Sequence, residues 1–242
     1  MQTSQLVRCL GLALGAVGFA AGCSDDDPAP FDPTREAKFR IVNASPAAQG
    51  EADFLLDGGR VARLGYAQTT TYIDVTAGTR TLEMRDLPDQ DGNPGPTFIS
   101  TPIDITAGRF ESAIVTGSGA DIAAIVTIDG ATPPGGSWSL RVIHAGQSTT
   151  SLDLYVTAPD ADLNAATPLV AGIDWKETTD YQVIGVGTLQ IRLTPTGTKT
   201  PVISSNSIPF QDGQVSSLFV FDNATPGNLP VGLLLADGGV LE

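Results

Sequence analysis

Short segments in which polar and apolar residues alternate run from about residue 37 to the end of the chain. Residues 39–44 form the first segment, and residues 79–85 show the alternation most clearly. A period of two residues is typical of a half-buried β-strand. Turn sequences such as Asp-Gly-Gly at 57–59 separate the segments, and none has a sustained helical period. The pattern predicts an all-β fold of antiparallel β-sandwich type.

The pattern occurs twice. Phe-Arg-Ile-Val-Asn-Ala at 39–44 returns as Leu-Arg-Val-Ile-His-Ala at 140–145. Self-similarity at one domain length indicates a tandem duplication. We therefore predict two tandem Ig-like or transthyretin-like antiparallel β-sandwich domains, residues 37–132 and 137–242, joined by a stiff Pro-containing linker at 133–136.

The first 22 residues predict an export signal. Arg8 precedes an apolar run that is shorter than the ~20 residues needed to cross a bilayer. The run ends in Ala-Ala-Gly before Cys23, which resembles a bacterial lipobox. That resemblance implies cleavage before Cys23 and acylation (palmitate) of its thiol, and Ser24 in the next position indicates an outer-membrane address. The alternative is a plain secretory signal followed by an incidental cysteine.

Residues 23–36 predict a tether. Between Ser24 and Ala37 the chain has three prolines and five acidic residues. A segment of this composition cannot bury a core and favours extended conformations. A solvated acidic spacer is therefore the better interpretation than a metal site.

Charge and cysteine usage exclude several classes of protein. The formal net charge is −14, which repels phosphate backbones and excludes a polybasic membrane anchor, so we expect no nucleic-acid partner. The only cysteines are Cys9 and Cys23. The predicted domains therefore contain no disulfide, and their stability depends on apolar burial.

The recognised catalytic patterns are absent from the sequence. His144 is the only histidine, and without a cysteine in the domains it excludes Cys-His catalysis and an ordinary zinc site. We expect His144 to bond the backbone of the loop that follows its strand, and Asn43 to do the same in the first copy. Gly-Ser-Gly-Ala-Asp at 117–121 imitates a dinucleotide fingerprint, but a β-branched segment follows it, so we predict a hairpin turn and no cofactor.

Two weaker candidates for ligand binding remain. Asp89, Asp91 and Asn93 have the spacing that begins a calcium loop, although the EF-hand pattern would require Glu where the chain has Ser100. A flexible hairpin loop is the alternative. Trp175 has charged neighbours, and we expect it to be exposed as a platform for a ligand such as a glycan.

The opening Arg-aliphatic-aliphatic-(Asn or His)-Ala sequence, the Asp-containing strand at 52–56 and the Ala-Gly-Thr turn at 77–79 resemble the domain of unknown function 4397 family. In that family the first strand usually reads Val-Arg-Val-Val-His-Ala-Ser-Pro. The first copy here has Asn43 for the histidine, and the second keeps His144 but replaces Ser-Pro. The resemblance implies an exported or lipid-anchored bacterial protein with tandem copies, and it implies no activity.

Three functional hypotheses follow. The first is a lipid-anchored cell-envelope protein, not an enzyme, which contacts the membrane through its anchor and binds a glycan or an envelope protein. The second is a carbohydrate-active enzyme that uses two carboxylates in an inter-domain cleft, since 27 acidic residues allow many pairs. The third is a calcium-stiffened surface adhesion module.

Overall fold

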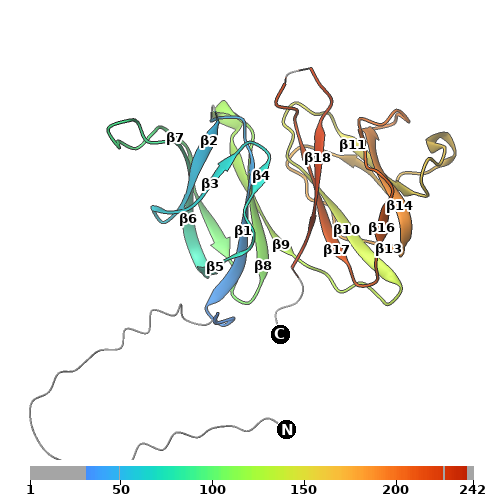
Figure 1. Cartoon of the computed structure of the whole chain (residues 1–242), viewed down its shortest axis with the longest axis horizontal. Helices are drawn as coiled ribbons and strands as arrows, with labels where there is room; N and C mark the ends of the chain where they lie inside the picture. The colour runs from blue at the N-terminus through green and yellow to red at the C-terminus, as the bar shows by residue number, and fades with distance from the viewer. Residues whose placement is uncertain (1–30, 49, 226, 239–242) are drawn as a thin grey trace, which may run out of the picture. The chain divides into compact units, whose positions relative to one another are not determined.

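A computed structural model describes residues 31–48, 50–225 and 227–238, which fall in one compact unit. These residues form eighteen β-strands and two short 3-10 helices, with no α-helix among them (Figure 1). The all-β sandwich class predicted from the alternation is confirmed. In this part of the chain no helical segment has the length and hydropathy needed to cross a bilayer.

The first copy of the repeat forms two sheets. Sheet A contains β4 (Gln68–Thr69), β5 (Ile73–Thr76), β1 (Glu36–Ala44), β8 (Phe110–Thr116) and β9 (Ala123–Asp129). Sheet B contains β3 (Gly59–Gly65), β2 (Glu51–Leu56), β6 (Gly78–Asp86) and β7 (Thr97–Ile105). A 3-10 helix, η1 (Gly119–Asp121), lies between β8 and β9.

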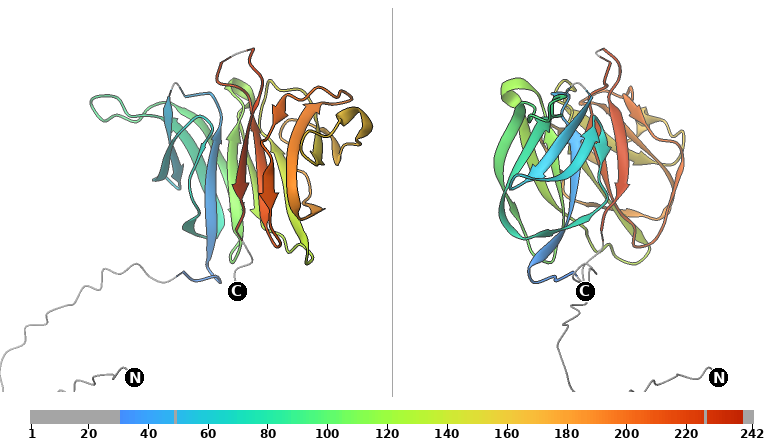
Figure 2. Two further views of the ribbon diagram at one scale, coloured as in Figure 1. Left: turned by 45° about the vertical axis from the view of Figure 1, so that its right-hand side comes forward. Right: turned by 60° about the vertical axis from the view of Figure 1, so that its left-hand side comes forward.

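The second copy repeats this arrangement. Sheet C contains β13 (Gln182–Gly185), β10 (Ser137–His144), β17 (Val215–Phe221) and β18 (Val231–Ala236). Sheet D contains β12 (Val170–Ile173), β11 (Leu152–Thr157), β14 (Gly187–Pro195), β15 (Ile203–Ser204) and β16 (Ile208–Phe210). The second 3-10 helix is η2 (Leu163–Ala165). Figure 2 shows the two sandwiches, blue to green and yellow to red, side by side.

The pairing of the strands is antiparallel, as predicted, except at one place in each copy. Strand β1 runs parallel to β8, and β10 runs parallel to β17. A parallel pair needs a long crossover, and here sheet B or sheet D supplies it. The same exception in both copies supports the duplication.

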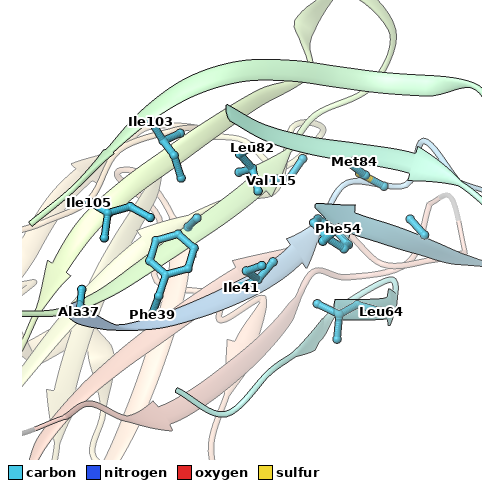
Figure 3. Close-up of a cluster of buried hydrophobic side chains, with 12 residues drawn as sticks. Ala37, Phe39, Ile41, Phe54, Leu64, Leu82, Met84, Ile103, Ile105 and Val115 are labelled. Carbon is cyan, nitrogen blue, oxygen red and sulfur yellow. The ribbon is translucent and has the colours of Figure 1, made fainter. Parts of the chain in front are cut away.

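Each sandwich has its own apolar core. In the first, alternate residues of β1 such as Phe39 and Ile41 pack against Phe54 and Met84 of sheet B (Figure 3). In the second, Trp138 stacks on Phe210 with their ring centroids 3.6 Å apart. These cores come directly from the two-residue alternation, because one face of each sheet carries the apolar side chains.

One strand of the first copy did not follow from the sequence pattern. Strand β3 begins directly after the Asp57-Gly58 turn, where both residues have positive φ (50° and 81°). Such a two-residue turn joins the strands of a tight hairpin. Arg60 and Arg63 interrupt the apolar alternation within β3, so the sequence pattern did not predict this strand.

Candidate functional site

The functional candidate built by both copies is the junction between the sandwiches. Residues of β1 that point away from the first core, such as Val42 and Ala44, pack against Ile143, Phe219 and Ala145 of the second copy. Sheets A and C therefore meet through their outer faces. Their central strands are buried on both sides, whereas the sequence alternation predicted half-buried strands.

Two arginines and two aspartates are buried in this junction. Arg40 Nη2 lies 3.2 Å from Asp129 Oδ2 and 2.8 Å from Asp237 Oδ1, and Arg141 Nη2 contacts Asp129 Oδ1. The exposed fractions of the two arginine side chains are 4% and 3%, and those of the aspartates are 0%. Burial of one such charge is costly unless it is paired and hydrogen-bonded. Here two positive and two negative groups balance.

Serine hydroxyls hold the arginines in place. Arg40 Nε donates to Ser112 Oγ at 2.8 Å, and Arg141 Nε donates to Ser217 Oγ at 2.6 Å. Each serine is the cross-strand neighbour of its arginine in the parallel pair. Ser217 then donates to Asp237 at 2.6 Å, as Ser112 does to Asp129. The arrangement is the same in both copies because the strand register is the same.

Two tyrosines complete the network. Tyr72 and Tyr181 donate to Asp129 and Asp237 respectively, both at 2.6 Å, and each ring lies 4.7 Å from the guanidinium carbon of its own copy's arginine. Burial is the main cause that raises the pKa of both phenols well above their usual range, so both stay neutral donors. Cation–π contacts of this kind add to the ion pairs.

A second set of reciprocal contacts closes the loop end of the junction. Tyr66 of the first copy donates its hydroxyl to the carbonyl oxygen of Asp222 in the second at 2.8 Å. Trp175 of the second copy donates Nε1–H to Thr116 Oγ1 in the first at 3.2 Å. Burial raises the pKa of Tyr66 to about 12. The two copies thus exchange one aromatic side chain each.

Trp175 was predicted to be an exposed platform for a ligand. The structure makes it half-buried in the junction, with its ring 4.0 Å from Lys176 Nζ on one side and its N–H bonded to Thr116. Gly117 lies against the same ring, since a Cβ built there would be 3.0 Å from it. The contacts of Trp175 are those of an interface residue.

His144 and Asn43 bond the loops that follow their strands. The amide nitrogen of Gly146 donates to Nδ1 of His144 at 3.3 Å, and that of Ser45 donates to Oδ1 of Asn43 at 3.1 Å. The other ring nitrogen of His144 lies 3.2 Å from the carbonyl oxygen of Thr150. Burial lowers the pKa of His144. These bonds fit the structural role expected for both side chains.

The predicted calcium loop is a compact turn. Asp89 Oδ1 accepts from the backbone nitrogens of Asp91 and Asn93 at 3.0 and 2.8 Å, and its Oδ2 accepts from the Asn93 amide at 2.9 Å. These bonds, above all the one from the Asn93 side chain, lower the pKa of Asp89. No group of three or more His, Cys, Asp or Glu in metal-binding geometry occurs in the described part of the chain. Cys23, the predicted lipidation site, lies outside the described residues.

The two buried carboxylates are in the place that the enzyme hypothesis would require, between the copies. Asp129 accepts from both arginines, from Ser112 and from Tyr72, and Asp237 accepts from Arg40 and two hydroxyls. Neither side chain is exposed. General acid–base catalysis requires a carboxyl within reach of the substrate. The arrangement therefore holds two sheets together and offers no oxygen to a sugar.

A recess of about 470 Å³ opens at the loop end of the same junction. Pro46 and Tyr66 of the first copy form one wall. The second copy supplies the rest from the loop after β10, the loop after β14 and the loop between β17 and β18. This volume is within the range of small-molecule sites.

The junction residues were present in the sequence pattern, but their role was not recognised. Arg40 and Arg141 are the repeated arginines of the opening strand, and Asp129 and Asp237 each precede a glycine, a pair that the sequence alone marks only as a turn signal. A charged residue at the same place in two copies of a strand was the available signal. Their pairing could not be deduced because it depends on how the copies pack.

Comparison with known proteins identifies a family for this chain. No curated protein matches the sequence. Among solved structures, the crystal structure of a "putative cell adhesion protein" from Bacteroides fragilis NCTC 9343 is 9% identical and covers 83% of this chain and 98% of its own, with a TM-score of 0.22. Residues 37–155, which extend from β1 into β11, match the sequence model of the domain of unknown function DUF4397. The chain belongs to the DUF4397 family.

Proposed function

We propose that this protein is a lipid-anchored cell-envelope protein with a non-catalytic binding or structural role. The observation that carries the proposal is the junction, where both buried aspartates and both buried arginines are engaged in holding the two sandwiches together. A scaffold that commits its buried charges in this way leaves them unavailable for chemistry. The lipobox-like sequence before Cys23 and the acidic tether at 23–36 support attachment to the outer membrane.

The proposed chain organisation follows the sequence. A signal peptide (1–22) directs export, Cys23 becomes the acylated first residue, and the tether at 23–36 separates two repeats (37–132 and 137–242) from the bilayer. Two or more acyl chains give a stable anchor, because each buried CH₂ contributes about 0.8 kcal/mol.

Metabolic labelling tests the anchor. In a bacterial host grown with an alkyne fatty acid, the wild-type protein should take up label and sediment with the outer membrane, and globomycin should block its processing. Cys23→Ala should abolish the label, whereas Cys9→Ala, at the other cysteine, should keep it. Equal labelling of wild type and Cys23→Ala would contradict the proposal.

A pull-down and an activity assay test the role. Acylated protein cross-linked in intact envelopes should capture a specific envelope component, and the same protein should release no reducing sugar from envelope polysaccharides. Sugar release that disappears in both Asp129→Asn and Asp237→Asn would instead favour the hydrolase.

A further inference from the structure

Hydrogen bonds of Asp222 connect three parts of the recess lining. Asp222 accepts from the backbone nitrogen of Ser148 (2.8 Å to Oδ2) and from the hydroxyl of Thr149 (2.8 Å to Oδ1), and its carbonyl oxygen accepts from Tyr66. Gly146 leaves room for this contact, because a Cβ there would lie 2.9 Å from Asp222 Oδ1 and 3.0 Å from its backbone nitrogen. The Tyr66 bond joins the two copies at the recess, and the other two hold the loop after β10 against Asp222 within the second copy.

Apolar side chains and uncharged polar side chains line the recess, together with Asp222. Val202 and three prolines supply the apolar surface, called the apolar floor here, and Leu152 borders the recess but is 0% exposed. Asp222 is the one charged residue that lines it, and its oxygens are bonded to the neighbouring loop. An anionic ligand is disfavoured further by the net charge of −14.

Four exposed side chains at the rim are available for hydrogen bonds. They are Ser148, Thr150, Thr225 and Asn228, and within the described residues their side chains make no hydrogen bond to another residue. Hydroxyl and amide groups both donate and accept. Together with the apolar floor they match a ligand that has an apolar face and neutral hydroxyls at its edge.

At the corresponding place on the other side of the junction, Gln147 of the second copy bonds the loop 117–122 of the first. There Gln147 accepts from the Ser118 hydroxyl at 3.1 Å and donates to Asp121 of η1 at 3.2 Å. The loop 222–230 of the second copy is longer than the loop 117–122 of the first. The recess therefore results from a departure from the duplication, as expected for a site added to a repeated scaffold.

We propose that this recess binds a single unit of a neutral saccharide, whose C–H face packs on the apolar floor and whose hydroxyls bond the Thr150, Thr225 and Asn228 side chains. The inference rests on the proposed envelope role and specifies its ligand class. Sites for small ligands combine an apolar lining with a few placed polar groups in this way.

Titration of the full-length acylated protein tests the inference, in a detergent that has no sugar headgroup. Methyl glycosides of glucose, galactose and N-acetylglucosamine are the probes, with glucuronate and glucose 6-phosphate as charged comparators. At least one neutral glycoside should bind saturably. Thr150→Val and Thr225→Val should each weaken its Kd about threefold to tenfold, the usual effect of one lost hydrogen bond. Thr71→Val, an exposed threonine remote from this recess, should leave the Kd unchanged.

Three results would overturn the inference: no saturable binding of any neutral glycoside, tighter binding of the charged comparators, or equal Kd values for all three variants. Failure here is distinguishable from failure of the proposed function. If no glycoside binds but the envelope pull-down still captures a component, only the saccharide assignment falls.

Discussion

Arg40 and Arg141 occupy the same position in the two copies, yet their ion pairs differ. Arg40 reaches Asp129 and Asp237, while Arg141 reaches Asp129 alone and completes its hydrogen bonds with Thr127 and the carbonyl oxygen of Ile128. Asp129 is therefore shared by both arginines and Asp237 serves one. The difference teaches that a duplicated network need not divide its energy equally between the copies.

The largest effect is expected for Asp129→Ala. This variant leaves Arg141 buried without a carboxylate and removes one of the two partners of Arg40. Removing one partner of a buried ion pair costs about 3–5 kcal/mol. Urea unfolding should show that loss. The matched control is Asp74→Ala, which breaks the partly exposed ion pair with Lys38 and should cost about 1 kcal/mol or less.

A smaller effect is expected for Asp237→Ala. Arg40 keeps its contact with Asp129 in this variant, so no guanidinium loses every carboxylate. The expected cost is about 1.5–3 kcal/mol, typical of hydrogen bonds to a charged group. The proposed difference between the two aspartates would be wrong if Asp237→Ala lost as much free energy of unfolding as Asp129→Ala, or more, under the same conditions.

The hydrogen bonds of the two reciprocal aromatic contacts should contribute less to stability, and about equally. Tyr66→Phe removes the hydrogen bond to Asp222, and Trp175→Phe removes the one to Thr116. A neutral hydrogen bond contributes about 0.5–1.5 kcal/mol. Thermal unfolding should give similar losses, with an additional packing loss for the smaller ring of Trp175→Phe. If Tyr66→Phe left the thermal stability unchanged, only one of the two contacts would stabilise the junction.

The smallest effect concerns pH, and it compares His144 with Asn43. Burial lowers the pKa of His144 in the folded protein, so the unfolded chain takes up the proton first as pH falls below about 6.5. The histidine therefore lowers the stability progressively between about pH 7 and pH 5. His144→Asn, which copies the first repeat, should make the stability less dependent on pH in this range.

Glu111 changes stability in the opposite direction. Burial raises the pKa of its carboxyl group, so its contribution weakens the fold as pH rises. Because Glu111 is unchanged in His144→Asn, the difference between the two denaturation profiles isolates the histidine. A wild-type profile that parallels the variant from pH 7 to pH 5 would show that His144 takes up its proton equally in the folded and unfolded states, which would contradict the prediction.

Most of the fold could be predicted because it depends on local patterns. The strands at Phe39 and Phe54 and their packing follow from the alternation of apolar residues, and the Asp57-Gly58 turn follows from residues that accept positive φ. Strand β3 was not predicted because Arg60 and Arg63 are three residues apart and so break the period of two residues. The parallel β1–β8 pairing escaped because strand direction depends on a partner some seventy residues away.

The candidate site could be predicted only in part. Residue type alone pointed to Trp175 and to the Asp89 loop. The structure shows Trp175 in the junction and the Asp89 loop as a turn held by its own hydrogen bonds. Nothing local distinguishes Asp129, a residue at the end of a strand, from an ordinary turn aspartate. Its role requires Arg141, which a different strand of the other copy supplies.

By itself, the sequence determined the β class, the recurrence of one pattern and the side chains that face each core, because the pleat of a strand alternates side chains whatever its surroundings. Only the tertiary structure decided whether the sheet faces that point away from each core are exposed to solvent or packed against another sheet. Whether Arg40 reaches Asp237 as well as the aspartate of its own sheet depends on two sheets, distant in the chain, packing against each other. The packing of the outer faces of sheets A and C depends on the whole area that both sheets bury. No short stretch of residues encodes that area.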